Sequence, residues 1–188
     1  MSTDALAAAF ASTRAVLVNV TPDQYDNATP CASWDVRALI NHIVAGSHYF
    51  AATARAGEPP AGVEPPDFTE DDPLTAFDAG ITASLEAFAA PDVGTRMITL
   101  PFGTMPGAAF MRIAAVDTFA HGWDLARATG QDSDLSPGLA RELLAGTREA
   151  LPESLRGLDG ESPFGAVVKV SDSASAADQL AAFLGRQT

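Results

Sequence analysis

The sequence predicts a single all-α domain, and three observations support this fold class. Hydrophobic residues make up 47% of the 188 residues, but aromatic residues account for only 7% because many of the apolar positions are alanine. This composition favours closely packed helices over sheets of bulky strands. Apolar residues also recur at helical spacing in several long segments. We expect one domain over residues 1–188, with a four-helix core at about 4–130 and a helical extension at about 136–188.

Two helices are expected in the first 57 residues. Apolar residues recur at helical spacing over residues 4–18, and a Thr-Pro pair then ends the pattern. The second helix is expected over residues 34–57, where Ser33 can cap the first turn and Gly57 can end the last.

A proline-rich loop and a third helix are expected next. Segment 58–72 contains four prolines and six acidic residues, which is a loop composition. The third helix is expected over residues 73–89, and Pro91 closes it. Its apolar side chains share one face: Leu74, Phe77, Ile81, Leu85 and Phe88.

The fourth helix is the most apolar segment of the chain. Residues 95–107 combine a β-branched run with Pro-Phe-Gly and Pro-Gly turn signals, so a small hairpin should precede it. The helix itself is expected over residues 108–130, with Gly130 as its stop. Because it is apolar on nearly every side, we expect it inside the bundle.

Shorter elements are predicted for the C-terminal extension. A fifth helix should begin at Ser136, a cap followed by a first-turn proline, and extend to about Ala150. A loop over residues 156–165, one short strand over 166–170 and a final helix over 174–185 should follow.

Charge and cysteine content narrow the classes of partner. The formal net charge is -13, and no Lys/Arg run is long enough to neutralise a row of phosphates. Nucleic acid and membranes are therefore not expected partners, and the acidity is expected to serve solubility. Cys31 is the single cysteine, so no intramolecular disulfide can form, and a cytoplasmic location is the simplest expectation. Asp4 stands where a signal peptide would carry positive charge, which favours a first helix instead.

Three ionisable residues share one stripe of the fourth predicted helix. Asp117, His121 and Asp124 are separated by four and three residues, which returns them to nearly the same face. Ionisable groups in an apolar bundle are costly unless they are paired or bind metal. The Asp-x-x-x-His spacing lets a carboxylate and an imidazole bind one ion, although this pattern also occurs by chance. Asp124 can ligate the metal, orient His121 from behind, or pair with Arg127, and we prefer the second role.

A second imidazole is available on the second predicted helix. His42 lies to one side of that helix's apolar stripe, at the edge where a groove could face His121. The alternative is a boundary histidine that hydrogen-bonds to a neighbour. His48 is expected to be a surface or packing residue, and Cys31 a small apolar residue. No phosphate loop, cysteine-based metal motif or nucleophile elbow is present.

Two segments resemble a known family. TPCASWDVRALINHIVAG at residues 29–46 and DTFAHGWDLARATGQ at residues 117–131 are together similar to the metal-binding N-terminal domain of mycothiol-dependent maleylpyruvate isomerases, within the DinB-like superfamily. The resemblance spans roughly residues 4–135 and implies a four-helix bundle with an open divalent-metal site, often zinc. It places the ligands at His42, Asp117 and His121.

The resemblance also implies chemistry at that metal. Three protein ligands leave a coordination position open, where a small thiol such as mycothiol can be activated for S-transfer or isomerisation. The isomerase has a glutamate at the position of Asp117 and a sizeable C-terminal domain, whereas this chain is similar to shorter relatives that lack that domain. Maleylpyruvate is therefore not the expected substrate.

Three hypotheses follow. The first is a thiol-dependent transferase or isomerase that acts on an electrophilic substrate. The second is a non-catalytic metal-binding or partner-binding module, and the third is the same bundle with a metal-free polar cluster. Ligand type suits nickel, iron or manganese as well as zinc. A homodimer is also compatible with a bundle.

Overall fold

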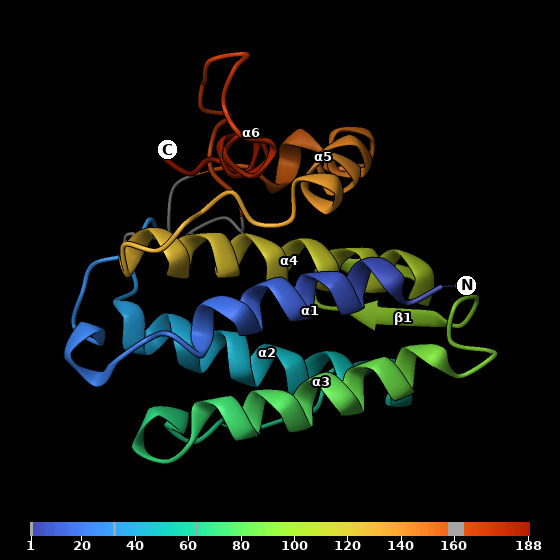
Figure 1. The fold of residues 1–188 in the computed structure, drawn as a ribbon. Helices are drawn as coiled ribbons and strands as arrows, with labels where there is room; N and C mark the ends of the chain where they lie inside the picture. Colours follow the sequence, from blue (N-terminus) through green and yellow to red (C-terminus); the bar gives the residue numbers. More distant parts are fainter. Residues whose placement is uncertain (1, 32, 63, 158–163) are drawn as a thin grey trace.

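Four long helices lie side by side in the computed structural model, which describes residues 2–31, 33–62, 64–157 and 164–188 (Figure 1). They are α1 (Asp4–Leu17), α2 (Val36–Ala56), α3 (Pro73–Ala89) and α4 (Gly107–Ala128). α1 packs against α4 and α3, and α2 packs against α3 and α4. The prediction of a mostly helical chain is confirmed; α1, α2 and α3 fall within the segments predicted for them, and α4 begins one residue before its predicted segment.

Local capping explains where the helices begin and end. The side chain of Asp35 accepts a hydrogen bond from the Ala38 N–H and caps α2, so the prediction of Ser33 as the cap was wrong by two residues. Gly57 ends α2 in the left-handed conformation, with φ of 84°, as the sequence predicts. Asp72 caps α3 by accepting from the N–H groups of Leu74 and Thr75. These caps fix the ends of α2 and α3.

A small antiparallel hairpin precedes α4, as predicted. β1 (Met97–Leu100) pairs with β2 (Gly103–Pro106), and Leu100 lies opposite Gly103 in the register. The N–H of Gly107 then donates to the carbonyl of Arg96, which ties the start of α4 to the base of the hairpin. The hairpin therefore sets where α4 starts.

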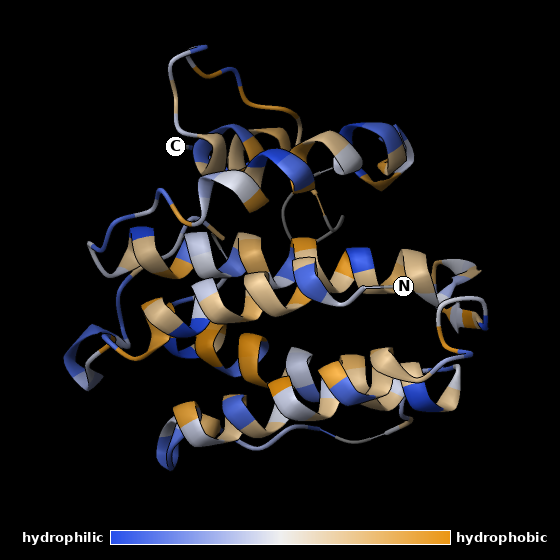
Figure 2. Ribbon diagram, turned by 45° about the vertical axis from the view of Figure 1, so that its right-hand side comes forward, coloured by the Kyte–Doolittle hydropathy of each residue, from blue (hydrophilic) through white to orange (hydrophobic). Residues whose placement is uncertain are grey.

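α4 is the most buried helix, as its apolar sequence predicts. Fourteen of its 22 residues are buried, including the fully buried rings of Phe119 and Trp123. Figure 2 shows the apolar colouring concentrated on the helices and the hydrophilic colouring on many of the connecting loops. Two ionisable residues, His121 and Asp124, are buried on this helix, so the core contains a polar site.

The C-terminal extension lies against the outer side of α4 (Figure 1). It contains α5 (Pro137–Ala150) and α6 (Ala176–Phe183), which pack against each other. The indole N–H of Trp123 donates to Asp178 on α6 at 2.9 Å. This bond attaches α6 to the helix that carries the predicted metal ligands. Single turns of 3-10 helix occur at Pro22–Gln24, Phe68–Glu70 and Glu153–Leu155.

Two predictions for the extension were wrong in detail. Residues 166–170 are not a strand: the N–H of Val168 donates to the carbonyl of Ala182, a residue of α6. Ser136 occupies the N-cap position of α5 with Pro137 in the first turn, as predicted, but its side chain makes no capping hydrogen bond, and its backbone is left-handed with φ of 37°. Part of the predicted loop, residues 158–163, lies outside the described residues.

No helix within the described ranges is both long enough and apolar enough to cross a membrane.

Candidate metal centre

The packing of α2 against α4 brings the three predicted ligands together. His42 Nε2 lies 3.8 Å from one carboxylate oxygen of Asp117, and His121 Nε2 lies 3.5 Å from the other. One ligand atom from each residue lies within 4.8 Å of the others. The two imidazole rings meet edge to face, with centroids 4.6 Å apart. Three side chains from two helices thus surround one point.

The donor set fits a divalent metal. His42 Nε2 is buried and has no hydrogen-bond partner among the described residues, and its 3.8 Å separation from Asp117 is too long for a hydrogen bond. A buried polar atom without a partner is costly unless something else binds it. Two imidazoles and one carboxylate form a common ligand set for metals with an open coordination position. The residues present therefore suit the metal that the sequence predicts.

The cluster is open on one side. About a third of the side chains of His42 and Asp117 is exposed, whereas the His121 side chain is only 9% exposed. The Trp34 ring lies against both imidazoles, with centroids 4.5 Å from His42 and 5.5 Å from His121. The side of the cluster formed by His42 and Asp117 is therefore its more exposed side, and it lies next to an aromatic ring.

Opposite charges within the cluster shift the pKa values of Asp117 and His121 in the directions that favour their charged forms. Burial acts to raise the pKa of Asp117, but the charge of His121, with a smaller effect from His42, outweighs it and holds that pKa well below its ordinary value. Burial likewise acts to lower the pKa of His121, and the facing carboxylates of Asp117 and Asp124 hold it well above its ordinary value. Asp117 is therefore ionised at neutral pH, and a metal would displace a proton from His121.

Asp124 lies behind His121, on the side of the ring opposite Asp117. It is completely buried, and its Oδ2 lies 3.0 Å from His121 Nδ1. Burial acts to raise the pKa of Asp124, but the charge of Arg186 and the hydrogen bond with His121 lower it. Because an ionised carboxylate only accepts, Nδ1 carries the hydrogen and Nε2 is left for a metal. Of the roles considered for Asp124, pairing with Arg127 is not seen, since that guanidinium lies over the Trp123 ring.

The sequence model of the mycothiol maleylpyruvate isomerase N-terminal domain family matches residues 6–126, which cover all but the two outermost residues of α1 and of α4 and include all three candidate ligands. The chain belongs to this family. Two uncharacterized proteins from two strains of Mycobacterium tuberculosis are each 39% identical to it over 173 residues. Each match covers 92% of this chain and 90% of the relative. The resemblance to short members of the family is therefore confirmed.

The sequence analysis missed two residues near the candidate metal centre. Cys31, interpreted as a small apolar residue, donates from Sγ to Asp124 Oδ2 at 3.3 Å, and with His121 and Asp124 it forms a second group of adjacent ligand atoms. Arg186 reaches Asp124 from 62 residues away and was not considered. No local spacing in the sequence links either residue to α4. His48 is exposed, and its Nε2 lies 3.0 Å from the carbonyl oxygen of Ala76, in agreement with the surface or packing role predicted for it.

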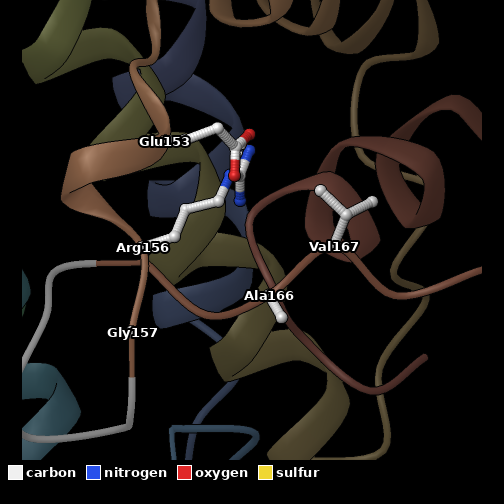
Figure 3. Close-up of a pocket in the computed structure, with 5 residues that line it drawn as sticks. All are labelled: Glu153, Arg156, Gly157, Ala166 and Val167. Carbon is white, nitrogen blue, oxygen red and sulfur yellow. Dashed lines mark hydrogen bonds and ion pairs between the residues drawn. The ribbon is translucent and has the colours of Figure 1, made fainter.

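Two cavities lie away from the candidate ligands. One, of about 460 Å³, lies in the C-terminal extension (Figure 3) and is lined by Glu153, Arg156, Gly157, Ala166 and Val167. Figure 3 shows the Arg156 guanidinium beside the Glu153 carboxylate. The other, of about 290 Å³, is lined by residues from the end of α3 and the start of α4. Neither cavity includes a candidate metal ligand.

Proposed function

We propose that this protein is a metal-dependent enzyme that activates a small thiol of the mycothiol class for S-transfer or isomerisation. The observation that carries this proposal is the buried, unpartnered Nε2 of His42, which faces Asp117 and His121 across the α2–α4 contact. We place these three residues as the ligands of one divalent metal, with zinc as the expected ion. The proposal treats α1 to α4 as a four-helix bundle of the DinB-like type.

Each ligand has a separate part in this proposal. Asp117 supplies the negative charge that attracts the cation, and His121 is held by Asp124 so that Nε2 faces the site. His42 lies on the more exposed side, next to Trp34, where a small thiol can enter. A divalent metal bound there would supply Lewis acidity that lowers the pKa of an incoming thiol.

The reactants are proposed by chemistry alone. A thiol made nucleophilic at this site requires an electrophilic small molecule as its second substrate, either one that accepts the sulfur or one that isomerises through a transient thiol adduct. The family's name supports mycothiol as the thiol. A thiol pool of this kind is consistent with a cytoplasmic location, with neither nucleic acid nor a membrane as partner. A homodimer is compatible with the proposal.

A second candidate function is a metal-binding module without turnover. The position of the two cavities supports it, because both lie away from His42, Asp117 and His121. In this alternative, the cluster binds the metal and the protein acts by docking to a partner.

Elemental analysis of protein purified without chelator tests the metal first. We expect about one metal atom per chain in the parent, a similar content in His48→Ala, and almost none in His121→Ala. His48 is the matched control because it lies on α2 but contacts Ala76 and Phe68, not the cluster. Metal-free parent protein after metal soaking would refute the proposal.

Cobalt-substituted protein then separates the two functions. Adding a small thiol should change the visible absorbance if a coordination position is open to it. An unchanged spectrum at saturating thiol would contradict the enzymatic function and leave the metal-binding module without turnover.

A further inference from the structure

The C-terminal end of the chain returns to the candidate metal centre. The family match ends at residue 126, but Arg186, beyond α6, reaches Asp124 on α4. Its Nη2 lies 3.1 Å from Asp124 Oδ2, and its Nε lies 3.3 Å from Oδ1. The two nitrogens of one guanidinium thus hold both oxygens of one carboxylate, which fixes the plane of that carboxylate.

This ion pair is almost fully enclosed. The Asp124 side chain is 0% exposed, and the Arg186 side chain is only 11% exposed. Among the described residues, Asp124 Oδ2 accepts from His121 Nδ1, from Cys31 Sγ and from both Nη2 and Nε of Arg186. The carboxylate therefore connects the C-terminal segment to the back of the His121 ring.

The backbone before Arg186 is built for a close approach. Gly185 is left-handed, with φ of 96°, and a Cβ at this position would lie 2.5 Å from the Cα of Gly165. Arg156 secures the same region, because its Nη1 donates to the carbonyls of Gly165 and Phe183. The point from which Arg186 reaches α4 is therefore rigidly placed.

We propose that Arg186 is a positioning residue of the metal centre, which acts through Asp124 to orient His121. This inference rests on the proposed function, since it assigns a role toward the metal that His42, Asp117 and His121 would bind. Arg186 does not touch that metal. It holds the Asp124 carboxylate at the angle that points His121 Nε2 toward Asp117, so the C-terminal extension completes a site whose ligands all lie in α1 to α4.

Metal affinity, measured by competition with a chromophoric chelator, tests the proposal without any assay of activity. Arg186→Met keeps the side-chain length and removes the guanidinium, so we expect a loss of affinity of about 10- to 100-fold. Arg186→Lys keeps the charge but not the paired donors, and should lose less affinity. The control is Arg14→Met, because Arg14 pairs with Asp78 between α1 and α3. The metal affinity of this variant should equal that of the parent.

A double-mutant cycle separates positioning from a general loss of folding. If Arg186 acts through Asp124, adding Arg186→Met to Asp124→Asn should cost no further affinity. The double variant also leaves no unpaired buried charge, so it keeps the test usable should Arg186→Met fold poorly. In cobalt-loaded protein, Arg186→Met and Arg186→Lys should both shift the visible spectrum, and Arg14→Met should not.

The outcomes distinguish this inference from the proposed function. If the parent binds no metal, the proposed function fails and this inference with it. If the parent binds metal and Arg186→Met binds it equally well, only the positioning role is overturned. Additive losses from Asp124→Asn and Arg186→Met would also overturn it, because the two residues would then act independently.

Discussion

Gly122, the residue after His121, lies where α4 packs tightly against α1. A Cβ at this position would lie 2.3 Å from Thr13 Oγ1, 3.0 Å from Thr13 Cβ and 3.1 Å from Thr13 Cα. The hydroxyl of Thr13 cannot simply rotate away, because it donates to the carbonyl of Thr118 at 2.8 Å. The Cα cannot move unless α1 moves. We therefore predict that Gly122→Ala forces the two helices apart.

The magnitude follows from two opposing effects. Replacing glycine by alanine inside a helix gains about 1 kcal/mol of helix propensity. Overpacking that requires a backbone shift costs up to about 3 kcal/mol. The net prediction for Gly122→Ala is a loss of about 2 kcal/mol in the free energy of unfolding, or a fall of about 4–8 °C in Tm for a chain of this size.

Gly146→Ala is the matched control. Gly146 is an exposed helical glycine on α5, and a Cβ there would meet nothing within 4 Å. This variant should therefore gain up to about 1 kcal/mol. Urea and thermal unfolding of both variants, followed by circular dichroism of metal-free protein, measure the difference. If Gly122→Ala proves as stable as the parent while Gly146→Ala is stabilised, the close approach of α1 and α4 is wrong.

Two further predictions use spectroscopy and pH. Metal binding should change the intrinsic tryptophan fluorescence, because the Trp34 ring contacts His42 and His121. Trp34→Phe should bind metal without that change. A fluorescence response that persists in Trp34→Phe would assign the signal to Trp123 instead. The hydrogen bond from Arg14 holds the pKa of Asp78 below its ordinary value. The pair therefore stabilises the fold above the ordinary Asp pKa of about 3.9, and this contribution is lost as the pH falls through the lowered pKa. The free energy of unfolding should therefore fall less steeply with decreasing pH in Asp78→Asn than in the parent. An unchanged pH profile would contradict this prediction.

Local signals predicted the helices because each depends on residues close together in the chain. The left-handed Gly57, the Asp72-Pro73 start of α3 and the turn residues of the hairpin act within a few positions. The cap of α2 was misassigned because Ser33 and Asp35 are both good caps, and only the path of the backbone decides which of them takes the N-cap position. The segment 166–170 has strand composition but no strand beside it among the described residues, so tertiary packing overrode its propensity.

Part of the candidate ligand set was predictable for the same reason, because Asp117 and His121 are one helical turn apart. His42 lies on another helix, where position alone also allowed a boundary histidine, and its assignment as a ligand depended on the resemblance to the family. The rest of the surroundings was not predictable, because Cys31 and Arg186 reach Asp124 across 93 and 62 residues. The sequence shows no periodic relation between Cys31 or Arg186 and Asp124, so it does not indicate that their side chains meet.

The Asp124–Arg186 pair is difficult to explain as a stabilising device. Burying two charges costs several kcal/mol per ion, and apolar residues of similar volume are often as stabilising or more so. The exposed ion pair between Arg14 and Asp78 has no comparable penalty, yet pairs of that kind contribute only about 0.2–1 kcal/mol. A buried pair placed directly behind His121 instead provides orientation, which apolar side chains cannot supply. The cost of burying Asp124 and Arg186 is thus better accounted for by the geometry of His121 than by the stability of the fold.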